Sequence, residues 1–413
     1  MKNLLLFTAL FLVVSGFAGC NNDSASPTPM TPATIKLTPG SDKVISGSNQ
    51  FGINLFARVA LEESKNLTLS PLSASAALTM LLNGTAGETF DQLRTVLDFP
   101  TGMNLAEINL AYKNLVGQLL EADPVVELAL ANAMFYRQGF QVKVPFVNTM
   151  KSDFNATVEG LNFSHQSAVD AINQWASDNT KGKIPVVIES ISDEMRLFLM
   201  NALYFKGQWT DAFNQAETRN LPFFTDATTR IDVPTMSRKL NARSVFTERY
   251  HAVELPYGRG NFAMVVVVPQ NIDLKSFLRG FTTATWSEIT GALDSQTVGG
   301  SIDVFLPRFQ FSFQKNLNQP LRAMGMVNAF DPNLANLSPI ADVRDLFVHF
   351  VNQNTYIQVN EEGTTAAAVT TIGIGITSVG PPPFVADRPF LFFIRERTTN
   401  TLLFAGQVLN PLM

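Results

Sequence analysis

The chain has 413 residues, of which 46% are hydrophobic and 16% charged, so we expect a sizeable packed core and exclude global disorder. Its net charge is −5 and no basic patch stands out, so nucleic acid is not an expected partner. Because Cys20 is the only cysteine, the chain can form neither an internal disulfide nor a cysteine-based metal site.

The N-terminal segment has the composition of an export signal. A mostly apolar run from Leu4 to Phe17 is too short to span a bilayer and has the usual length of a secretory signal. It ends in Phe17-Ala18-Gly19-Cys20, which resembles the lipobox of bacterial lipoproteins, where the cysteine receives lipid. The alternative is a plain signal peptide cleaved nearby. We expect residues 1–19 to be a lipoprotein signal and Cys20 to be lipidated. The protein would then be exported and anchored to a bacterial membrane, in the periplasm or at the cell surface.

The next segment, residues 20–45, is rich in Asn, Ser, Pro and Thr, which predicts an extended tether with no core of its own. A globular pattern begins near residue 46 and continues to residue 413 without a second linker or an internal repeat. This pattern predicts a single domain over residues 46–413.

Helices are predicted mainly in the first half of this domain, where apolar residues recur at helical spacing. Ser70 is a candidate N-cap, with Pro71 in the first turn of its helix. The predicted helices are Gln50–Glu63, Ala74–Leu82, Thr85–Leu97, Asn104–Glu121, Ala168–Thr180, Leu274–Leu278, Thr282–Leu293 and Leu317–Met324.

Strands are predicted mainly in the second half, and Phe262–Val268 is apolar throughout, as a core strand would be. The predicted strands are Asn66–Leu69, Val125–Tyr136, Thr157–Phe163, Arg196–Tyr204, Asn220–Phe224, Thr229–Ser237, Ser244–Thr247, His251–Pro256, Phe262–Val268, Ser301–Phe309, Tyr356–Val359, Phe390–Glu396 and Thr401–Val408. Few β-α-β units occur, so we expect an α+β fold with largely antiparallel sheets.

Sequence motifs of enzymes are absent: there is no G-x-S-x-G, H-E-x-x-H or P-loop pattern. His165, His251 and His349 lie far apart in sequence and are interpreted as structural or surface residues. The adjacent carboxylates Glu62-Glu63 and Glu361-Glu362 point apart on a helix or strand, which disfavours acid–base pairing. We therefore expect no enzyme activity, no cofactor and no metal.

One stretch near the C-terminus is unusual. It opens with Glu361-Glu362-Gly363, continues with small and β-branched residues, and ends in three prolines at residues 381–383. Between Gly363 and Asp387 there is no charged residue. A long, neutral, strand-competent segment is an aggregation hazard unless it has a use, which marks this stretch as a candidate functional element.

Several motifs together resemble the serpin family. The most distinctive is Asn201–Trp209, and the C-terminal Arg388–Arg395 and Leu403–Pro411 fit the last sheet strands of that family. The remaining matches are Asn66–Ser73, Ile172–Trp175, Thr180–Ile184, Glu254–Tyr257, Met324–Met326, Ala329-Phe330 and Ala335–Ser338. The resemblance implies a serpin fold, with about nine helices around three mostly antiparallel sheets and an exposed reactive-centre loop.

The resemblance also implies a mechanism. The stretch after Gly363 would be bait for a protease, whose nucleophile forms an acyl-enzyme with it. The cut loop would then enter the central sheet and distort the trapped protease, and serpin loop insertion is itself a standard example of β-strand addition. By strand alternation Thr364, Ala366 and Ala368 would face the interior while Thr365 and Ala367 face outward, and none of them is charged.

Counting from Gly363 as the family does, the cleaved bond is predicted at Thr377–Ser378, with Ile376–Thr377 and Ser378–Val379 as alternatives. No Lys or Arg lies near this bond, which argues against trypsin-like targets. Elastase-like or subtilisin-like serine proteases are favoured, and papain-like cysteine proteases stay open.

Other roles carry over from the family residue by residue. The hinge would comprise residues 361–368: Glu361, Glu362, Gly363, Thr364, Thr365, Ala366, Ala367 and Ala368. Ser70, Ser73, Asn201 and Gln353 would form the shutter, a buried polar cluster beneath the central sheet, with Gln353 in place of the family's usual, titratable His. Trp209, Arg308 and Glu361 would form the breach, where insertion starts, and the alternative for Arg308–Glu361 is an exposed surface ion pair.

The sequence thus predicts a monomeric, lipid-anchored inhibitor of serine proteases. The alternative is a serpin that does not inhibit proteases and acts as a binding or structural protein.

Overall fold

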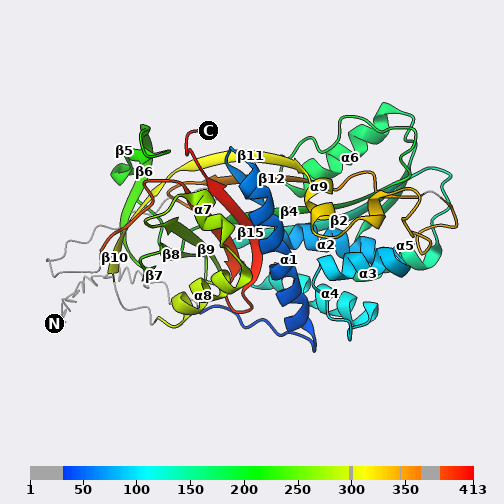
Figure 1. The fold of residues 1–413 in the computed structure, drawn as a ribbon, viewed down its shortest axis with the longest axis horizontal. Coiled ribbons are helices and arrows are strands. Elements are labelled where there is room, and N and C mark those ends of the chain that lie inside the picture. The colour runs from blue at the N-terminus through cyan, green and yellow to red at the C-terminus, as the bar shows by residue number, and fades with distance from the viewer. Residues whose placement is uncertain (1–30, 297–300, 345, 364–381) are drawn as a thin grey trace, which may run out of the picture. The chain divides into compact units, whose positions relative to one another are not determined.

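The computed structural model describes residues 31–296, 301–344, 346–363 and 382–413. This part of the chain contains nine α-helices, most of them in its first half (Figure 1). They are α1 (Ser41–Glu62), α2 (Pro71–Leu82), α3 (Gly87–Val96), α4 (Leu105–Glu121), α5 (Val144–Phe154), α6 (Gln166–Asn179), α7 (Leu274–Arg279), α8 (Thr283–Asp294) and α9 (Asn318–Ala323). None of these helices is both long enough and apolar enough to cross a membrane.

The strands form four hydrogen-bonded groups in the same part of the chain, ordered β1-β15-β14-β9-β8-β7, β13-β10-β6-β5, β3-β2-β4 and β11-β12. The strands are β1 (Leu67–Leu69), β2 (Val126–Arg137), β3 (Thr157–Leu161), β4 (Leu197–Gly207), β5 (Arg219–Phe224), β6 (Arg230–Asn241), β7 (Arg243–Phe246), β8 (Tyr250–Tyr257), β9 (Phe262–Pro269), β10 (Ser301–Pro307), β11 (Phe309–Asn316), β12 (Asn352–Val359), β13 (Phe384–Val385), β14 (Phe390–Glu396) and β15 (Thr401–Val408). The α+β class is confirmed. The three expected sheets occur as four groups, because β4 and β12 are not hydrogen-bonded to each other.

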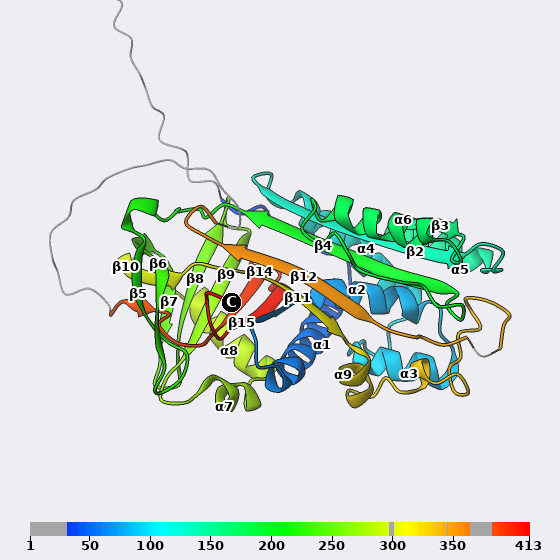
Figure 2. The same ribbon diagram turned by 90° about the horizontal axis from the view of Figure 1, so that it is seen from above.

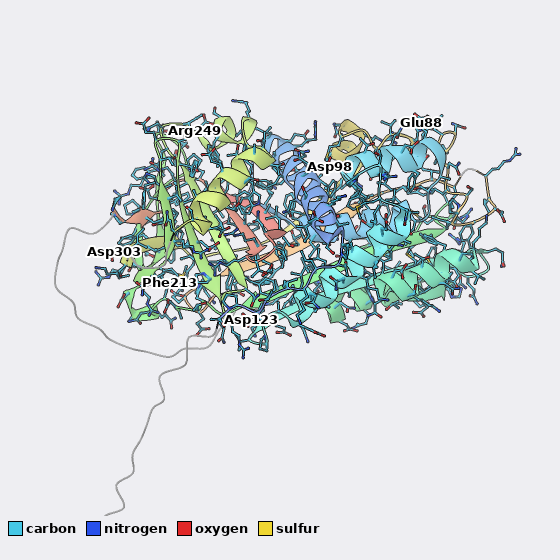
Figure 3. The ribbon with its side chains drawn as sticks, turned by 90° about the horizontal axis from the view of Figure 1, so that it is seen from below. Glu88, Asp98, Asp123, Phe213, Arg249 and Asp303 are labelled. Atoms are coloured by element: carbon cyan, nitrogen blue, oxygen red, sulfur yellow. The ribbon has the colours of Figure 1, made fainter. Side chains whose placement is uncertain are left out.

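The centre of the core is the six-stranded sheet. Its strands β9, β14 and β15 are buried at every residue, so the sheet is covered on both faces. The α1 helix packs against β15, and the ring of Phe56 meets that of Phe393 edge-to-face at 5.8 Å. Charged side chains such as Glu88 and Arg249 lie at the edge of the molecule (Figure 3).

The predicted tether ends earlier than residue 45. Residues 31–40 lie against the domain, where the Asn261 side chain accepts a hydrogen bond from the Ala33 main chain (2.7 Å) and donates one back (2.8 Å). Ile35 is buried, and α1 begins at Ser41 with Val44 and Ile45 in the core. The prediction of an extended, coreless chain is therefore wrong for residues 31–45, and residues 20–30 lie outside the described residues.

Two of the longer elements, α5 and β11, were not expected from the sequence. The α5 helix begins beside Pro145, a residue suited to the first helical turn, and buries Phe146, Met150 and Phe154. The β11 strand follows β10 after Arg308 alone and pairs with β12 along its whole length. The predicted strand Ser301–Phe309 thus covers only the first of two consecutive strands.

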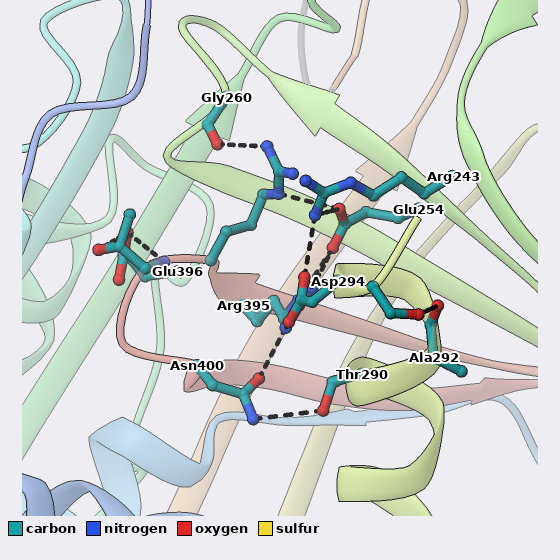
Figure 4. Close-up of polar contacts among 12 residues, drawn as sticks. Arg243, Glu254, Gly260, Thr290, Ala292, Asp294, Arg395, Glu396 and Asn400 are labelled. Carbon is teal, nitrogen blue, oxygen red and sulfur yellow. Dashed lines mark hydrogen bonds and ion pairs between the residues drawn. The ribbon is translucent and has the colours of Figure 1, made fainter. Parts of the chain in front are cut away.

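A buried ion cluster joins four elements around Arg395 (Figure 4). Arg395, on β14, is fully buried and donates to Glu254 of β8 (2.5 and 3.0 Å) and to Asp294 of α8 (2.6 and 3.0 Å). Two more guanidinium groups join the cluster from its rim: Arg397 lies 2.9 Å from Glu254, and Arg243 lies 2.9 Å from Asp294. Burial alone would lower the pKa of Arg395, but the bonds to Asp294 and Glu254 outweigh burial and raise that pKa.

Candidate functional site

Two strands, β4 and β12, run beside each other without a hydrogen-bonded ladder between them. Among the described strands β4 pairs with β2, and β12 pairs with β11. The two strands lie side by side with α6 on one face and α2 on the other (Figure 2). Each therefore offers an unpaired edge to the other, and such edges accept an added strand.

A cavity of about 640 Å³ is lined by both strands. The side chains of β4 alternate between two hydrophobic clusters: Phe198 and Met200 belong to the α6 face, and Leu199 and Leu203 to the α2 face. The lining also includes Ser73, Ala77, Trp175, Thr180, Asn201, Gln353 and Asn354. The charged residues of the lining, Glu194, Arg196 and Arg344, lie outside β4 and β12. Beside the two strands themselves an inserted strand would meet apolar and neutral polar groups, so a charged side chain would be costly there.

Ser70 and Gln353 are joined beside this cavity. The Gln353 side chain accepts a hydrogen bond from the Ser70 backbone N–H (3.0 Å) and donates one to the Ser70 carbonyl (2.8 Å). The Ser70 hydroxyl caps α2 by accepting from the Ser73 N–H (3.2 Å), and it donates to the Leu403 carbonyl (2.8 Å). Leu403 lies at a β-bulge in β15: Ile394 of β14 is opposite Phe404, and the next residue, Arg395, is opposite Leu402. The structure thus brings Ser70, Ser73 and Gln353 together. The Gln353 amide, which does not titrate, satisfies the backbone N–H and carbonyl of Ser70.

Asn201, the fourth predicted shutter residue, is hydrogen-bonded outside that set. Its amide donates to Asn132 of β2 (2.7 Å), and Asn132 donates to the Phe154 carbonyl (2.7 Å). Asn201 lines the same cavity as Ser73 and Gln353 but is not hydrogen-bonded to either. Asn132 was missed at the sequence level, although a single buried Asn inside an apolar strand is a usable signal of a buried polar network.

The chain leaving β12 is fixed to the end of β4 at Trp209. The Trp209 N–H donates to the Glu362 carbonyl (2.9 Å), and its indole N–H donates to the Asn360 carbonyl (2.9 Å). The indole stacks on Tyr257 with ring centroids 4.4 Å apart and planes 11° apart. Gln208 and Gly363 form an isolated antiparallel bridge at the same place. The predicted breach residue Trp209 therefore closes one end of the gap between β4 and β12.

Glu361 and Arg308, the other predicted breach residues, are also brought together here. Arg308 Nε donates to the Glu361 carboxylate (2.6 Å), which also accepts from the Thr218 hydroxyl. The Glu361 side chain is only 7% exposed and that of Arg308 35%, so the alternative of an exposed surface pair is wrong. Because the carboxylate is buried with two donors, this contact holds the start of the hinge more firmly than a surface pair would.

Gly363 occupies a position that only glycine fits. Its φ is +131°, and an added Cβ would overlap the Gly207 carbonyl and lie 2.7 Å from Gln208 Cα. We expect Gly363→Ala to lower the free energy of unfolding by roughly 1–3 kcal/mol, because the backbone must leave this conformation. Urea-induced unfolding measures the loss. The matched control is Gly102→Ala, where a Cβ meets nothing within 4 Å, and an equal loss in both variants would contradict this reading of the hinge.

The remaining predicted site residues lie outside the described residues: hinge residues Thr364–Ala368, the bond at Thr377–Ser378 with its alternative Ile376, and Cys20. The histidines are separate from one another in the described fold. His251 packs against Phe246 (4.7 Å between centroids) and His349 against Phe347 (4.2 Å), and burial lowers the pKa of both.

The chain resembles known sequences over most of its length. The family model for serpin (serine protease inhibitor) matches residues 46–411. A serpin-like protein of Methanosarcina acetivorans is 31% identical over 424 aligned residues, covering 100% of this chain and 96% of the relative. The leukocyte elastase inhibitor of Homo sapiens is 31% identical over 386 residues, covering 90% of this chain and 100% of the relative.

Solved structures have the same fold. The native state of the thermophilic serpin tengpin matches with a TM-score of 0.81 at 26% identity, over 93% of this chain and 97% of tengpin. Thyroxine-binding globulin in complex with thyroxine matches with a TM-score of 0.80 at 28% identity, over 89% of this chain and 99% of the globulin. With a family match from residue 46 to residue 411 and the gap between β4 and β12 closed at Trp209 by the hinge, this chain belongs to the serpin family.

Proposed function

We propose that this protein inhibits serine endopeptidases as a suicide substrate, by cleavage of the segment after Gly363 and its insertion between β4 and β12. The observation that carries the proposal is the unpaired gap between these strands, which begins where Gly363 leaves the sheet. The protease's hydroxyl would attack the carbonyl of Thr377, break the amide bond to Ser378 and leave Thr377 esterified to the enzyme. Insertion before hydrolysis of that ester would trap the protease.

The segment itself supports a preference for elastase-like or subtilisin-like proteases. It contains no charged residue from Thr364 to Ala386, and Ile376, Thr377 and Ser378 suit small apolar specificity pockets. The human relative named leukocyte elastase inhibitor agrees with this preference. Papain-like cysteine proteases are a further target class, because a thiolate forms the equivalent acyl-enzyme.

Incubation with elastase and with subtilisin, followed by denaturing gel electrophoresis, tests the proposal. We expect a covalent complex with the mass of protease plus the N-terminal fragment, and mass spectrometry should place the cut at Thr377–Ser378 or within one residue of it. Cleavage without any complex would overturn inhibition. It would favour a binding serpin instead, a role for which the relative in complex with thyroxine gives a precedent.

We further propose that Cys20 carries the lipid that anchors the exported protein to a bacterial membrane. Each buried acyl methylene contributes about 0.8 kcal/mol, so several chains give stable anchoring. Cys20→Ala should move the protein from the membrane fraction to the soluble fraction in the native host. A matched control, Ser24→Ala, should stay with the membrane. Retention of Cys20→Ala on membranes would overturn the anchor.

A further inference from the structure

The described chain begins as a strap, residues 31–40, that lies along α4. The Lys36 N–H donates to the Gln118 side chain (3.2 Å). Two residues later, the Thr38 N–H donates to the Asn114 side chain (3.2 Å). The partner residues move back along α4 as the strap advances, so the strap runs antiparallel to the helix. The chain therefore enters the described structure beside the C-terminal end of α4.

The solvent side of α4 carries large apolar residues. The helix buries one face in the core, and the opposite face of such a helix is ordinarily polar. Here large apolar side chains are exposed on the helix, on the strap and just after the helix, and together they make what we call the outer face. They are Leu110 (58% exposed) and Leu120 of α4, Leu37 of the strap, and Val125. Gly117 lies between the two helical leucines, and a Cβ there would meet nothing within 4 Å. Exposed apolar side chains gathered in this way mark a contact surface.

The charges around the outer face nearly balance. Lys36 and Lys113 are exposed there, and so is Glu121. Glu107 is exposed too, but its carboxylate accepts the Asn104 N–H (2.8 Å) at the start of the helix. The face therefore suits an apolar surface without net charge better than a strongly charged partner. The zwitterionic interface of a bilayer has this chemistry, and the flexible lysine side chains can extend their ammonium groups to its phosphates.

The chain before Thr31 is short enough to keep a lipid at Cys20 within reach of this face. From Cys20 to Thr31 the backbone spans at most about 40 Å, and α4, with its 17 residues, is about 25 Å long. Val125 of the outer face lies against the same turn, residues 258–260, as Pro32 of the strap, so the point of entry adjoins the outer face. A short linkage raises the effective concentration of the face at the membrane to the millimolar range. A contact too weak for a free protein is then populated.

We propose that the outer face of α4 lies against the bilayer to which Cys20 is anchored. This inference rests on the proposed lipid anchor and adds a second, noncovalent contact with the same membrane. The apolar side chains of the outer face enter the boundary between headgroups and acyl chains. The domain then has one preferred orientation on the membrane, with α4 toward the lipid, instead of turning freely on its linkage.

Labelling of lysine amines with a membrane-impermeant acylating reagent tests the contact. The protein isolated from its host is placed in phosphatidylcholine vesicles and compared with Cys20→Ala protein in solution without vesicles, and mass spectrometry gives the labelling rate of each lysine. We expect Lys36 and Lys113 to be labelled at least about threefold more slowly in the anchored protein, because the bilayer covers their side chains. Lys275 of α7, which lies apart from α4 in both ribbon views (Figure 1, Figure 2), is the matched control and should be labelled at the same rate in both samples.

A charged variant of the outer face gives an independent readout. Leu110→Glu combined with Leu120→Glu places two carboxylates in the contact, where they would lose their hydration. We expect this variant, anchored in the same vesicles, to regain the solution labelling rate at Lys113. Its melting temperature should not change, because both leucines are exposed. Ile272→Glu alters an exposed side chain beside α7 and should keep the protection of Lys113.

The outcomes separate this inference from the proposed anchor. If Lys36 and Lys113 are labelled equally fast in both samples, the membrane contact is overturned and the anchor stands. If the protein from its host carries no lipid, the anchor has failed, and the free Cys20 thiol is coupled to a maleimide lipid in the same vesicles. Protection of the two lysines there supports the outer face, and its absence overturns it. Protection that grows with protein concentration without vesicles would mean that the face binds a second copy of the chain, which also overturns the membrane contact.

Discussion

Thr364→Arg should convert the protein from an inhibitor into a substrate. Thr364 follows Gly363, so it would be the first side chain to enter the gap between β4 and β12 on its interior face. The residues of β4 and β12 that line this gap are apolar or carry neutral amides, with Leu199, Asn201 and Gln353 among them. The charged lining residues Glu194 and Arg196 precede β4, at the end of the strand away from Gly363. A guanidinium would lose its hydration without gaining a carboxylate partner, and a penalty of about 3 kcal/mol would slow insertion by roughly 100-fold. Hydrolysis of the acyl-enzyme would then win.

The measurement is the number of inhibitor molecules consumed per inactivated protease, together with the band of covalent complex. We expect the complex to disappear and cleaved inhibitor to accumulate, with little change in the rate of cleavage. Thr365→Arg is the matched control, because its side chain would face outward in an inserted strand and should leave trapping largely intact. Equal trapping by wild type and Thr364→Arg would show that Thr364 does not enter the sheet.

Elements with strong local patterns were the predictable part of the fold. The predicted strand Phe262–Val268 is β9 to within one residue, and its continuous apolar run reflects burial on both faces. The predicted helix Asn104–Glu121 is α4, which begins with a capping box between Asn104 and Glu107. In both, local chemistry and tertiary packing favour the same structure.

Other elements depend on distant partners that the local pattern does not reveal. The first nine residues of α1, which were not predicted as helix, include the buried polar residues Ser48 and Asn49, and these interrupt the apolar stripe. Asn49 is buried because its side chain forms hydrogen bonds with the backbone of Asn400 and Leu402. The β11 strand was missed although Phe309, Phe311 and Phe313 alternate with polar residues, a usable strand signal. The predicted strand Ser301–Phe309 ends at the first residue of β11, and no strand was predicted for residues 310–316.

The candidate site was predictable only in part, and for the same reason. Ser70, Ser73 and Gln353 followed from family motifs, and the structure gives them their hydrogen bonds. The partner of Asn201 did not follow, because it depends on the register of β2 against β4, which places Asn132 directly opposite. Register between two long strands is set by packing across the whole sheet, so a motif on one strand does not specify it.

Replacing Arg395 should destabilise the fold more than any surface substitution of the same kind. Arg395→Met keeps much of the side-chain volume but leaves Glu254, 2% exposed, without its closest cation. Arg397, 2.9 Å from Glu254, compensates in part. Breaking a buried pair by removing one partner costs about 3–5 kcal/mol, because the remaining charge stays buried. We expect a loss in this range in urea-induced unfolding, with a lower melting temperature.

Two further variants decide whether the uncompensated charge causes the loss. Arg388→Met removes an exposed arginine that pairs with Asp387, and it should cost less than about 1 kcal/mol. The double variant Arg395→Met with Glu254→Gln removes both charges of the central pair. It should be more stable than the sum of the two single losses predicts, since neither buried charge is left alone. Strict additivity would mean that Arg395 stabilises the sheet through packing and its bonds to Asp294 rather than by neutralising Glu254. In that case the cluster would act as a hydrogen-bonded clamp between α8 and β14, and Asp294→Asn would then cost as much as Arg395→Met.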